Sequence, residues 1–337
     1  MKLKLATSAM LLAGATFAAH AQTQITGAGS TFGAPLYSKW GETAASKIGT
    51  TLNYQAIGSG AGINQINNRT VDFGASDMPL KGDALKAHNE TQFPTAIGGV
   101  DIIVNLPGVQ ANQLKLTGDV LADIYLGTIR KWNDPKIAEL NKDMKLPNVA
   151  IAPVYRADGS GTTFVFTDYL SMVSPDWKSK VGSATSVRWL AGSGAKGSDG
   201  VAGTVKNIRG GIGYVESAYA DQNHLTTTLL RNKDGQFVAP TADAFSAAAS
   251  SADWSKVENF AVDLNDEPGA KSWPIESATF VIIPLDAQNP AQTQAVLKFF
   301  DWGFANGDPI ATQLLYIPLP SAVKDAIRAD WKSKVRS

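Results

Sequence analysis

Cysteine is absent from the 337 residues of this chain, and histidine occurs only three times. Without cysteine no disulfide can form, so the stability of the folded chain must come from packing. Attachment to a lipid through a cysteine is excluded for the same reason. His88 and His224, the two histidines outside the N-terminal segment, lie in polar stretches far along the sequence from the glycine-rich turns described below. We therefore expect neither a metal site nor a cofactor.

The common sequence signatures of enzymes are missing as well. The chain has no G-x-S-x-G motif, no Walker P-loop with its lysine and no H-E-x-x-H motif. Residues 192–197 match the spelling G-x-G-x-x-G. No convincing strand precedes this match, so we interpret it as a loop rather than as a dinucleotide site. The sequence does not predict an enzyme.

An excess of charge of either sign is also lacking, with 30 Lys and Arg against 30 Asp and Glu. Proteins that bind nucleic acid usually carry a strongly basic surface, so this balance argues against nucleic acid as a partner. Four basic residues near the C-terminus are expected on the solvated side of a terminal helix: Arg328, Lys332, Lys334 and Arg336.

The first 21 residues have the pattern of a secretory signal peptide. Lys2 and Lys4 give a basic start, an apolar stretch follows over residues 6–19, and Ala19-His20-Ala21 matches an A-x-A cleavage site. The apolar stretch is too short to span a bilayer, and no later stretch approaches the necessary length. We expect cleavage after Ala21, export of the mature chain and no direct insertion into the membrane.

Alternating helix and strand patterns predict an α/β fold. Apolar spacing indicates helices within residues 35–48, 63–66, 121–132, 164–173, 296–304 and 323–335, and strands at residues 51–57, 71–75, 149–155 and 212–215. Two longer apolar runs, residues 93–106 and 278–284, are expected to carry the chain between two domains. We therefore predict a signal peptide at residues 1–21, a discontinuous domain I of residues 22–103 and 276–337, and an inserted domain II of residues 104–275.

Three glycine- and serine-rich turns, each leading into a helix-like segment, are the most informative feature of the chain. They are Gly27-Ala28-Gly29-Ser30-Thr31-Phe32, Gly58-Ser59-Gly60-Ala61-Gly62 and Asp158-Gly159-Ser160-Gly161-Thr162-Thr163. Such a turn exposes successive backbone N–H groups, and the helix that follows adds the positive end of its dipole. Two turns belong to the predicted domain I and the third to domain II. An oxyanion held by both sets would lie in the cleft between the domains.

Charged residues accompany the turns. Arg156 supplies a planar fork of donors suited to phosphate or carboxylate, and Asp158 is placed to hold that fork in position. Asp77 follows the strand pattern at residues 71–75. As an acid it is unfavourable for a fully deprotonated anion, but favourable for one that carries a hydrogen, as hydrogen phosphate does and sulfate does not. The pattern predicts a site selective for a protonated oxyanion.

Each of these residues also has a purely structural interpretation that the sequence leaves open. Phe32 is compatible with a core position, and Arg156 with an ion pair to Asp158 in a surface turn. Four further residues are compatible with helix N-caps: Thr31, Ser59, Asp77 and Ser160.

The same motifs resemble those of the periplasmic phosphate-binding proteins of Pst-type ABC transporters, the PstS family. The resemblance rests on the three turns together with Val71-Asp72-Phe73-Gly74-Ala75-Ser76-Asp77, Gly211-Ile212-Gly213-Tyr214-Val215-Glu216 and Leu297-Lys298-Phe299-Phe300-Asp301-Trp302. It covers essentially the whole chain after the signal peptide. It implies a two-lobed, type II-like binding-protein fold with mixed sheets flanked by helices and the ligand in the interdomain cleft.

The resemblance also implies a function and a set of contacts. The function is high-affinity capture of inorganic phosphate in the periplasm and its delivery to the permease subunits of an ABC importer, by a protein expected to be a monomer. Carried over by motif, the phosphate contacts are Thr31, Phe32 through its backbone N–H, Ser59, Asp77, Arg156, Ser160, Gly161 and Thr162, with Asp158 orienting Arg156. The chain departs from one member of the family at Gly60, where that member has a second serine, and at Tyr155, where it has an arginine before the motif arginine.

Two other classes of function stay open on the sequence alone. A secreted phosphatase would also hold phosphate, but it needs a nucleophile with a base or a metal cluster, and no histidine lies near the turns. In a surface adhesion protein the turns would be merely structural. Among binding proteins, the alternative ligands are sulfate, molybdate and organic phosphates.

Overall fold

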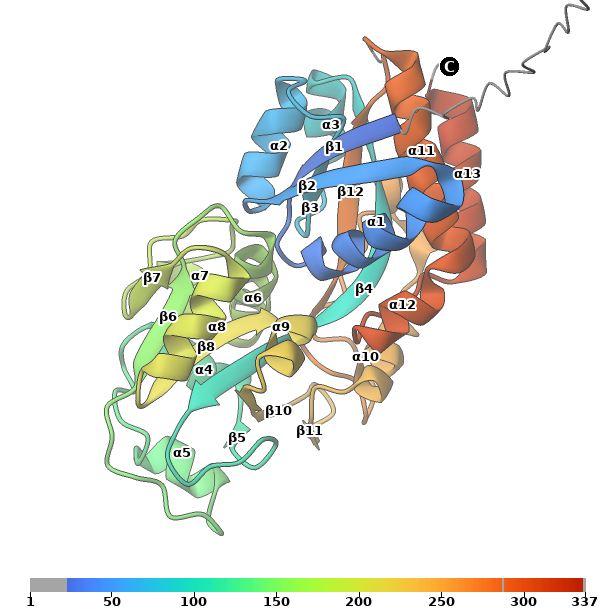
Figure 1. The fold of residues 1–337 in the computed structure, drawn as a ribbon. Helices are drawn as coiled ribbons and strands as arrows, with labels where there is room; N and C mark the ends of the chain where they lie inside the picture. The colour runs from blue at the N-terminus through green and yellow to red at the C-terminus, as the bar shows by residue number, and fades with distance from the viewer. Residues whose placement is uncertain (1–22, 287, 336–337) are drawn as a thin grey trace, which may run out of the picture.

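The computed structural model describes residues 23–286 and 288–335 of the chain, which form two lobes joined by long strands (Figure 1). The predicted signal peptide lies outside these residues. Within the described part of the chain, no helix combines the length and the apolar character needed to cross a membrane.

Strands and helices alternate along most of the described chain, as the sequence predicts. The strands are β1 (Thr23–Gly29), β2 (Thr50–Ala56), β3 (Phe73–Ser76), β4 (Glu90–Asn105), β5 (Lys115–Leu116), β6 (Ala152–Arg156), β7 (Ser193–Ala195), β8 (Gly211–Glu216), β9 (Thr226–Thr227), β10 (Leu229–Arg231), β11 (Phe237–Val238) and β12 (Glu276–Pro284). The α-helices are α1 (Ala34–Ile48), α2 (Ser59–Asn67), α3 (Gly82–Ala87), α4 (Gly118–Tyr125), α5 (Pro135–Leu140), α6 (Gly161–Val173), α7 (Pro175–Lys180), α8 (Gly197–Asn207), α9 (Ser217–Gln222), α10 (Ala242–Ala249), α11 (Pro290–Asn306), α12 (Asp308–Gln313) and α13 (Ser321–Lys334). Two short 3-10 helices are η1 (Trp254–Lys256) and η2 (Glu258–Phe260).

One mixed sheet runs through both lobes in the strand order β2-β1-β3-β12-β4-β8-β6-β7. Strand β4 pairs antiparallel with β12 from Glu90 to Gly99 and with β8 from Val100 to Asn105, so it passes from the first lobe to the second (Figure 1). Strands β1 to β3 belong to the first lobe, and β6 to β8 to the second. A small sheet, β11-β10-β5, lies at the base of the second lobe.

The two apolar runs predicted to connect the domains correspond to β4 and β12, which pair along their lengths. The predicted boundary after residue 103 falls inside β4, and the one before residue 276 falls at the start of β12. The exact division into domains stays a prediction.

Side chains from alternate faces of the first-lobe strands enter separate clusters. Ile25 of β1 joins the main core with Leu36 and Trp40 of α1, whereas Ala28 of the same strand packs with Ile66 of α2. Successive side chains of a strand point to opposite faces, so this sheet is covered by helices on both sides. Because helices cover both faces, a ligand can be reached by loops only at the edge formed by the carboxyl ends of the parallel strands.

Helix α1 illustrates how the predicted elements form. Pro35 stands in its first turn, where a missing N–H is harmless, and Leu36, Trp40 and Ala44 bury one face at i+4 spacing. Gly49, with φ of 68°, ends the helix in the left-handed region that favours glycine.

Two predicted segments are wrong. The helical stripe expected to continue to Trp132 ends at Tyr125, because Gly127 adopts φ of 77° and donates its N–H to Ile124 in a C-terminal turn. Residues 192–197, interpreted as a loop, instead contain strand β7, which pairs with β6 and leads directly into α8. These residues therefore contain a strand and lead into a helix, which the residues around them in the sequence did not indicate.

Candidate functional site

The three glycine-rich turns follow the carboxyl ends of β1, β2 and β6, and they meet between the lobes. The N–H of Gly60 donates to the carbonyl of Gly159 at 2.9 Å, and the N–H of Gly161 donates to Ser59 Oγ at 3.0 Å. Ser59 belongs to the first lobe and Gly161 to the second. The turns that the sequence predicted to share a ligand are therefore in direct contact with one another.

Glycine is required at two points of this contact. Gly58 adopts φ of 92°, and a Cβ there would lie 2.4 Å from Asp158 Oδ2. A Cβ on Gly161 would lie 2.5 Å from Ser59 Oγ and 2.6 Å from Asp77 Oδ2. All three distances are too short for a side chain, so the absence of side chains lets the turns pack closely.

Arg156 lies at the end of β6 and is 4% exposed, which excludes a surface ion pair. Its Nε donates to Asp158 Oδ1 at 2.8 Å and its Nη2 to Asp158 Oδ2, so the fork is held as predicted. Its Nη1 reaches across to Thr31 Oγ1 at 2.9 Å. Although burial acts in the opposite direction, the hydrogen bonds and charge of Arg156 hold the pKa of Asp158 below its ordinary value.

Asp77 follows β3 and is 1% exposed. Its Oδ1 accepts hydrogen bonds from the hydroxyls of Ser30 and, at 2.9 Å, of Thr279. Burial raises the pKa of Asp77 to about 6, while those hydroxyls and the charge of Arg156 act in the opposite direction. The interpretation of Asp77 as a helix N-cap is wrong, because α3 begins later, after Lys81.

Hydroxyl groups surround the same place. Ser59 Oγ accepts from the N–H groups of Gly161 and Asp77, and Ser160 Oγ accepts from Thr163 N at 3.0 Å. Since these oxygens already accept from the backbone, their single hydrogens are left to donate elsewhere. Thr162 Oγ1 is buried and has no hydrogen-bond partner among the described residues. A buried polar atom of this kind calls for a ligand or water to satisfy it.

The structural interpretations of the remaining residues have different outcomes. Ser160 is indeed the N-cap of α6. Thr31 is not the cap of α1, since Gly33 occupies that position, and Ser59 is the first residue of α2 rather than its cap. Phe32 is a core residue, fully buried with its ring 6.2 Å from that of Tyr316. Its side chain is accounted for by packing, and a contact to an anion would use its backbone.

Three residues of this region were missed by the sequence analysis. Ser30 had a signal, because it stands inside the first turn. Ser198, at the start of α8, lies 2.8 Å from Thr31 Oγ1 through its Oγ, and it directly follows residues 192–197, for which the sequence predicts only a loop. Thr279, on β12, lies 202 residues from Asp77 along the chain and had no local signal.

The two departures from the family pattern have simple local accounts. Gly60 contributes its backbone N–H to Gly159, which needs no side chain. Tyr155 stacks on Trp189, with ring centroids 4.8 Å apart and planes 13° from parallel. An aromatic stack thus replaces a positive charge beside Arg156.

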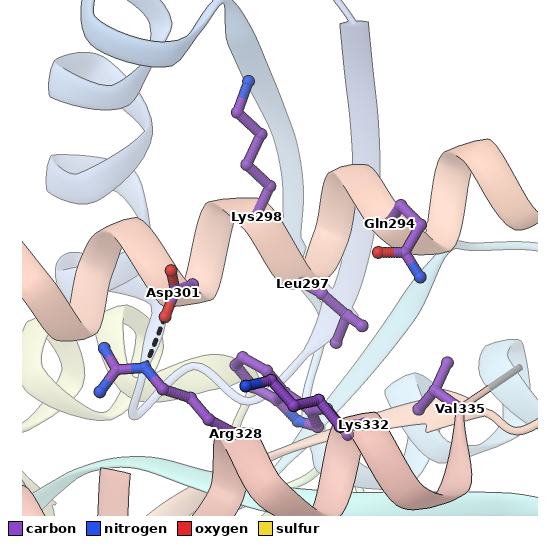
Figure 2. A pocket seen from close by; sticks show the side chains of 8 residues that line it. Gln294, Leu297, Lys298, Asp301, Arg328, Lys332 and Val335 are labelled. Carbon is purple, nitrogen blue, oxygen red and sulfur yellow. Dashed lines mark hydrogen bonds and ion pairs between the residues drawn. The ribbon is translucent and has the colours of Figure 1, made fainter. Parts of the chain in front are cut away.

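A separate groove lies between α11 and α13, away from the turns (Figure 2). It has a volume of about 520 Å³ and is lined by Gln294, Leu297, Lys298, Asp301, Arg328, Trp331, Lys332 and Val335. Figure 2 shows Arg328 turned toward Asp301, to which its Nε donates at 2.6 Å. None of the predicted site residues lines this groove.

Among the described residues, no group of three or more His, Cys, Asp or Glu side chains is arranged so that it could hold a metal ion. The donors between the lobes are instead backbone N–H groups, hydroxyls and one guanidinium. Such a set binds oxyanions by hydrogen bonds and charge. The fold is that of a two-lobed binding protein, and these donors form a candidate anion site between its lobes.

Comparison with known proteins places the chain more closely. A family model described as a PBP superfamily domain matches residues 15–306. The chain is 51% identical over 332 residues to the phosphate-binding protein PstS of Pasteurella multocida, covering 98% of this chain and 96% of that protein. It is 49% identical over 312 residues to PstS of Haemophilus influenzae, covering 93% of each. The crystal structure of a phosphate-binding protein from Stenotrophomonas maltophilia has the same fold, with a TM-score of 0.69, 22% identity, and coverage of 91% of this chain and 93% of that one.

The chain belongs to the PBP superfamily and, within it, to the PstS family of phosphate-binding proteins. This family consists of substrate-binding transport proteins rather than enzymes, in agreement with the prediction from the sequence.

Proposed function

We propose that this protein captures inorganic phosphate in the periplasm, as a monomer, and delivers it to the permease subunits of an ABC importer. The observation that carries the proposal is the meeting of the three turns from both lobes around Arg156 and the hydroxyl of Thr162, which has no partner in the described part of the chain. The names of the relatives from Pasteurella multocida and Haemophilus influenzae support the choice of ligand.

The proposed contacts come from both lobes. Thr31, the backbone of Phe32, Ser59 and Asp77 belong to the first lobe, and Arg156, Ser160, Gly161 and Thr162 to the second, with Asp158 orienting Arg156. A ligand favours a closed arrangement only through interactions that the open one lacks. An anion that bridges the two sets therefore holds the lobes together.

Asp77 is proposed to select a protonated anion. The hydroxyls of Ser30 and Thr279 donate to its Oδ1, and a hydrogen bond from Ser59 also acts on the carboxylate and lowers its pKa. A carboxylate has about four acceptor positions, so Asp77 retains the capacity to accept a hydrogen from phosphate. Sulfate has no hydrogen to offer, and two unit charges about 4 Å apart repel by about 4 kcal/mol at an effective dielectric constant near 20. That exceeds the ~1 kcal/mol of an ordinary hydrogen bond, so repulsion dominates the discrimination.

Calorimetric titration with phosphate, sulfate and arsenate tests the proposal. At pH 7.5 we expect phosphate to bind and sulfate to bind about a thousandfold more weakly, as the repulsion of ~4 kcal/mol requires. Because the pKa of Asp77 is about 6, the competition by sulfate should strengthen as the pH falls through that value and the carboxylate becomes neutral. Light scattering of the same sample should give the mass of one chain.

The matched control is Asp77→Asn, which keeps the shape of the side chain and removes its charge. In this variant the difference between phosphate and sulfate should shrink at pH 7.5. Equal binding of the two anions by the unchanged protein would remove Asp77 as the selective group, and no binding of phosphate at all would overturn the proposed function.

A further inference from the structure

Helix α8 begins against the centre of the site, although none of its residues belongs to the predicted contacts. Ser198, in its first turn, is 1% exposed. Its Oγ lies 2.8 Å from Thr31 Oγ1 and accepts from Arg156 Nη1 at 3.4 Å. The preceding N–H, of Gly197, donates to Asp158 Oδ1 at 3.0 Å. The start of α8 therefore contacts Thr31 and both members of the Arg156–Asp158 pair.

The direction of the hydrogen bond between Thr31 and Ser198 follows from the donors around Thr31. A guanidinium can only donate, so Thr31 Oγ1 is an acceptor toward Arg156 Nη1 at 2.9 Å. A hydroxyl has two acceptor sites and one hydrogen. If Ser198 donates to the second acceptor site of Thr31 Oγ1, only the hydrogen of the Thr31 hydroxyl has no assigned partner, and this hydrogen is free to point to a ligand. In the opposite direction, Thr31 would spend its hydrogen on Ser198.

We infer that Ser198 is a positioning residue of the phosphate site, whose hydroxyl donates to Thr31 Oγ1 and so turns the hydrogen of Thr31 toward the anion. The inference rests on the proposed function and on the placement of Thr31 among the contacts. Ser198 acts through Thr31 and needs no contact with phosphate of its own. Because Thr31 and Ser198 come from different lobes, this orientation is complete only when the lobes are together.

The test is a double-mutant cycle on phosphate affinity, measured by calorimetry. Ser198→Ala should weaken binding about fivefold, the amount that one ordinary hydrogen bond contributes. In a Thr31→Val background, which lacks the hydroxyl that Ser198 orients, adding Ser198→Ala should cost less than twofold. An independent role of Ser198 would instead give the same factor in both backgrounds. That result, or unchanged affinity in Ser198→Ala, would overturn the inference.

A second variant separates hydrogen bonding from packing. Ser198→Cys has a similar shape and a somewhat larger side chain but is a weak donor, so it should bind phosphate no more strongly than Ser198→Ala. Binding at the original strength would show that volume alone matters and would refute the role in positioning. Ser193→Ala, at an exposed serine of the neighbouring β7, is the matched control. Failure of the unchanged protein to bind phosphate would instead refute the proposed function, so the two failures are distinguishable.

Discussion

Arg156 is buried with its guanidinium divided between Asp158 and Thr31. The two bonds to Asp158, which belongs to the same lobe, fix the plane of the fork before any ligand arrives, and hydrogen bonds from a charged donor contribute about 1.5–3 kcal/mol each. A positioned fork also loses little freedom on binding. Arg156 is therefore the side chain on which the affinity of the proposed site should depend most strongly.

Replacing Arg156 with alanine should weaken phosphate binding by about 3 kcal/mol, roughly 150-fold, because it removes the charged donor. Arg156→Lys keeps a positive charge but not the planar fork, so its affinity for phosphate should lie between those of the unchanged protein and Arg156→Ala. Calorimetry measures both variants, and circular dichroism of the free proteins checks that each is folded. An affinity in Arg156→Ala equal to that of the unchanged protein would exclude Arg156 from the site.

Single residues also show how far the sequence could predict the site. Arg156, Asp158 and the hydroxyls of the turns stand in short motifs, so their chemistry is readable from neighbours along the chain. The partner of Asp77 on β12, Thr279, is brought close only by the antiparallel pairing of β12 with β3. Neither residue carries a local mark of that contact, so no pattern in the sequence could have predicted it.

At the scale of elements, the strands that join the lobes carry an unusual set of buried acids. Asp101 of β4, Glu216 of β8 and Glu276 of β12 are each at most 3% exposed. In the ladder, Val100 faces Glu216 and Gly99 faces Glu276, so the three acids lie on adjacent strands at neighbouring positions. Burial raises the pKa of each of them. The connection between the lobes therefore contains acids that resist ionisation.

Asp101 makes this property measurable. Burial raises its pKa to about 8 from 3.8, opposed by the hydrogen bond from Ser217 and increased by the charge of Asp221. Between these two values the folded state holds a proton that the unfolded state has lost. The free energy of unfolding must therefore fall as the pH rises through this window, by up to about 1.4 kcal/mol per pH unit.

Asp101→Asn removes the titrating group while keeping an acceptor for Ser217. Denaturant unfolding of both proteins between pH 5 and pH 8 should show a shallower loss of stability in the variant. Parallel curves over the whole range would mean that Asp101 does not titrate there. The charge of Asp101 also raises the pKa of Glu216, so the difference between the two proteins reports the titration of Asp101 together with its coupling to Glu216.

Elements also mark where prediction from the sequence succeeds and where it fails. The helix with Leu36, Trp40 and Ala44 on one face was predicted because its periodicity and its proline agree with its burial. Strand β7 was missed because it has only three residues and pairs at an edge with β6. Short strands gain their stability from a partner elsewhere in the chain, and hydrophobic periodicity carries no information about that partner.

At the scale of the whole molecule, the lobes are held together at the site by a few specific contacts. They include the bonds from Gly60 N to Gly159 O, from Gly161 N to Ser59 Oγ and from Arg156 Nη1 to Thr31 Oγ1, together with the Thr31–Ser198 bond. Strands β4 and β12 connect the lobes on which these residues lie. If phosphate binds among the turns as proposed, we expect its entry and release to require these contacts to break.

A disulfide between the turns provides a direct test of this requirement. A Cβ on Gly60 would lie 3.3 Å from Gly159 Cα, and a Cβ on Gly159 would lie 3.3 Å from Gly60 Cα, so both positions accept a side chain once the turns shift by a few tenths of an ångström. This proximity suits a disulfide, whose Cβ atoms lie about 3.5–4.5 Å apart. Because the chain has no other cysteine, Gly60→Cys with Gly159→Cys can form only one intramolecular pair.

Oxidising this double variant in the presence of radioactive phosphate should trap the anion. After removal of free phosphate, the label should exchange with unlabelled phosphate far more slowly than in the reduced protein, and reduction should restore rapid exchange. The two single variants, treated in the same way, control for the effect of each side chain on affinity. The disulfide prevents the lobes from separating at residues 60 and 159. Exchange at the same rate in the oxidised and reduced double variant would therefore mean that phosphate reaches its site without separation of the turns.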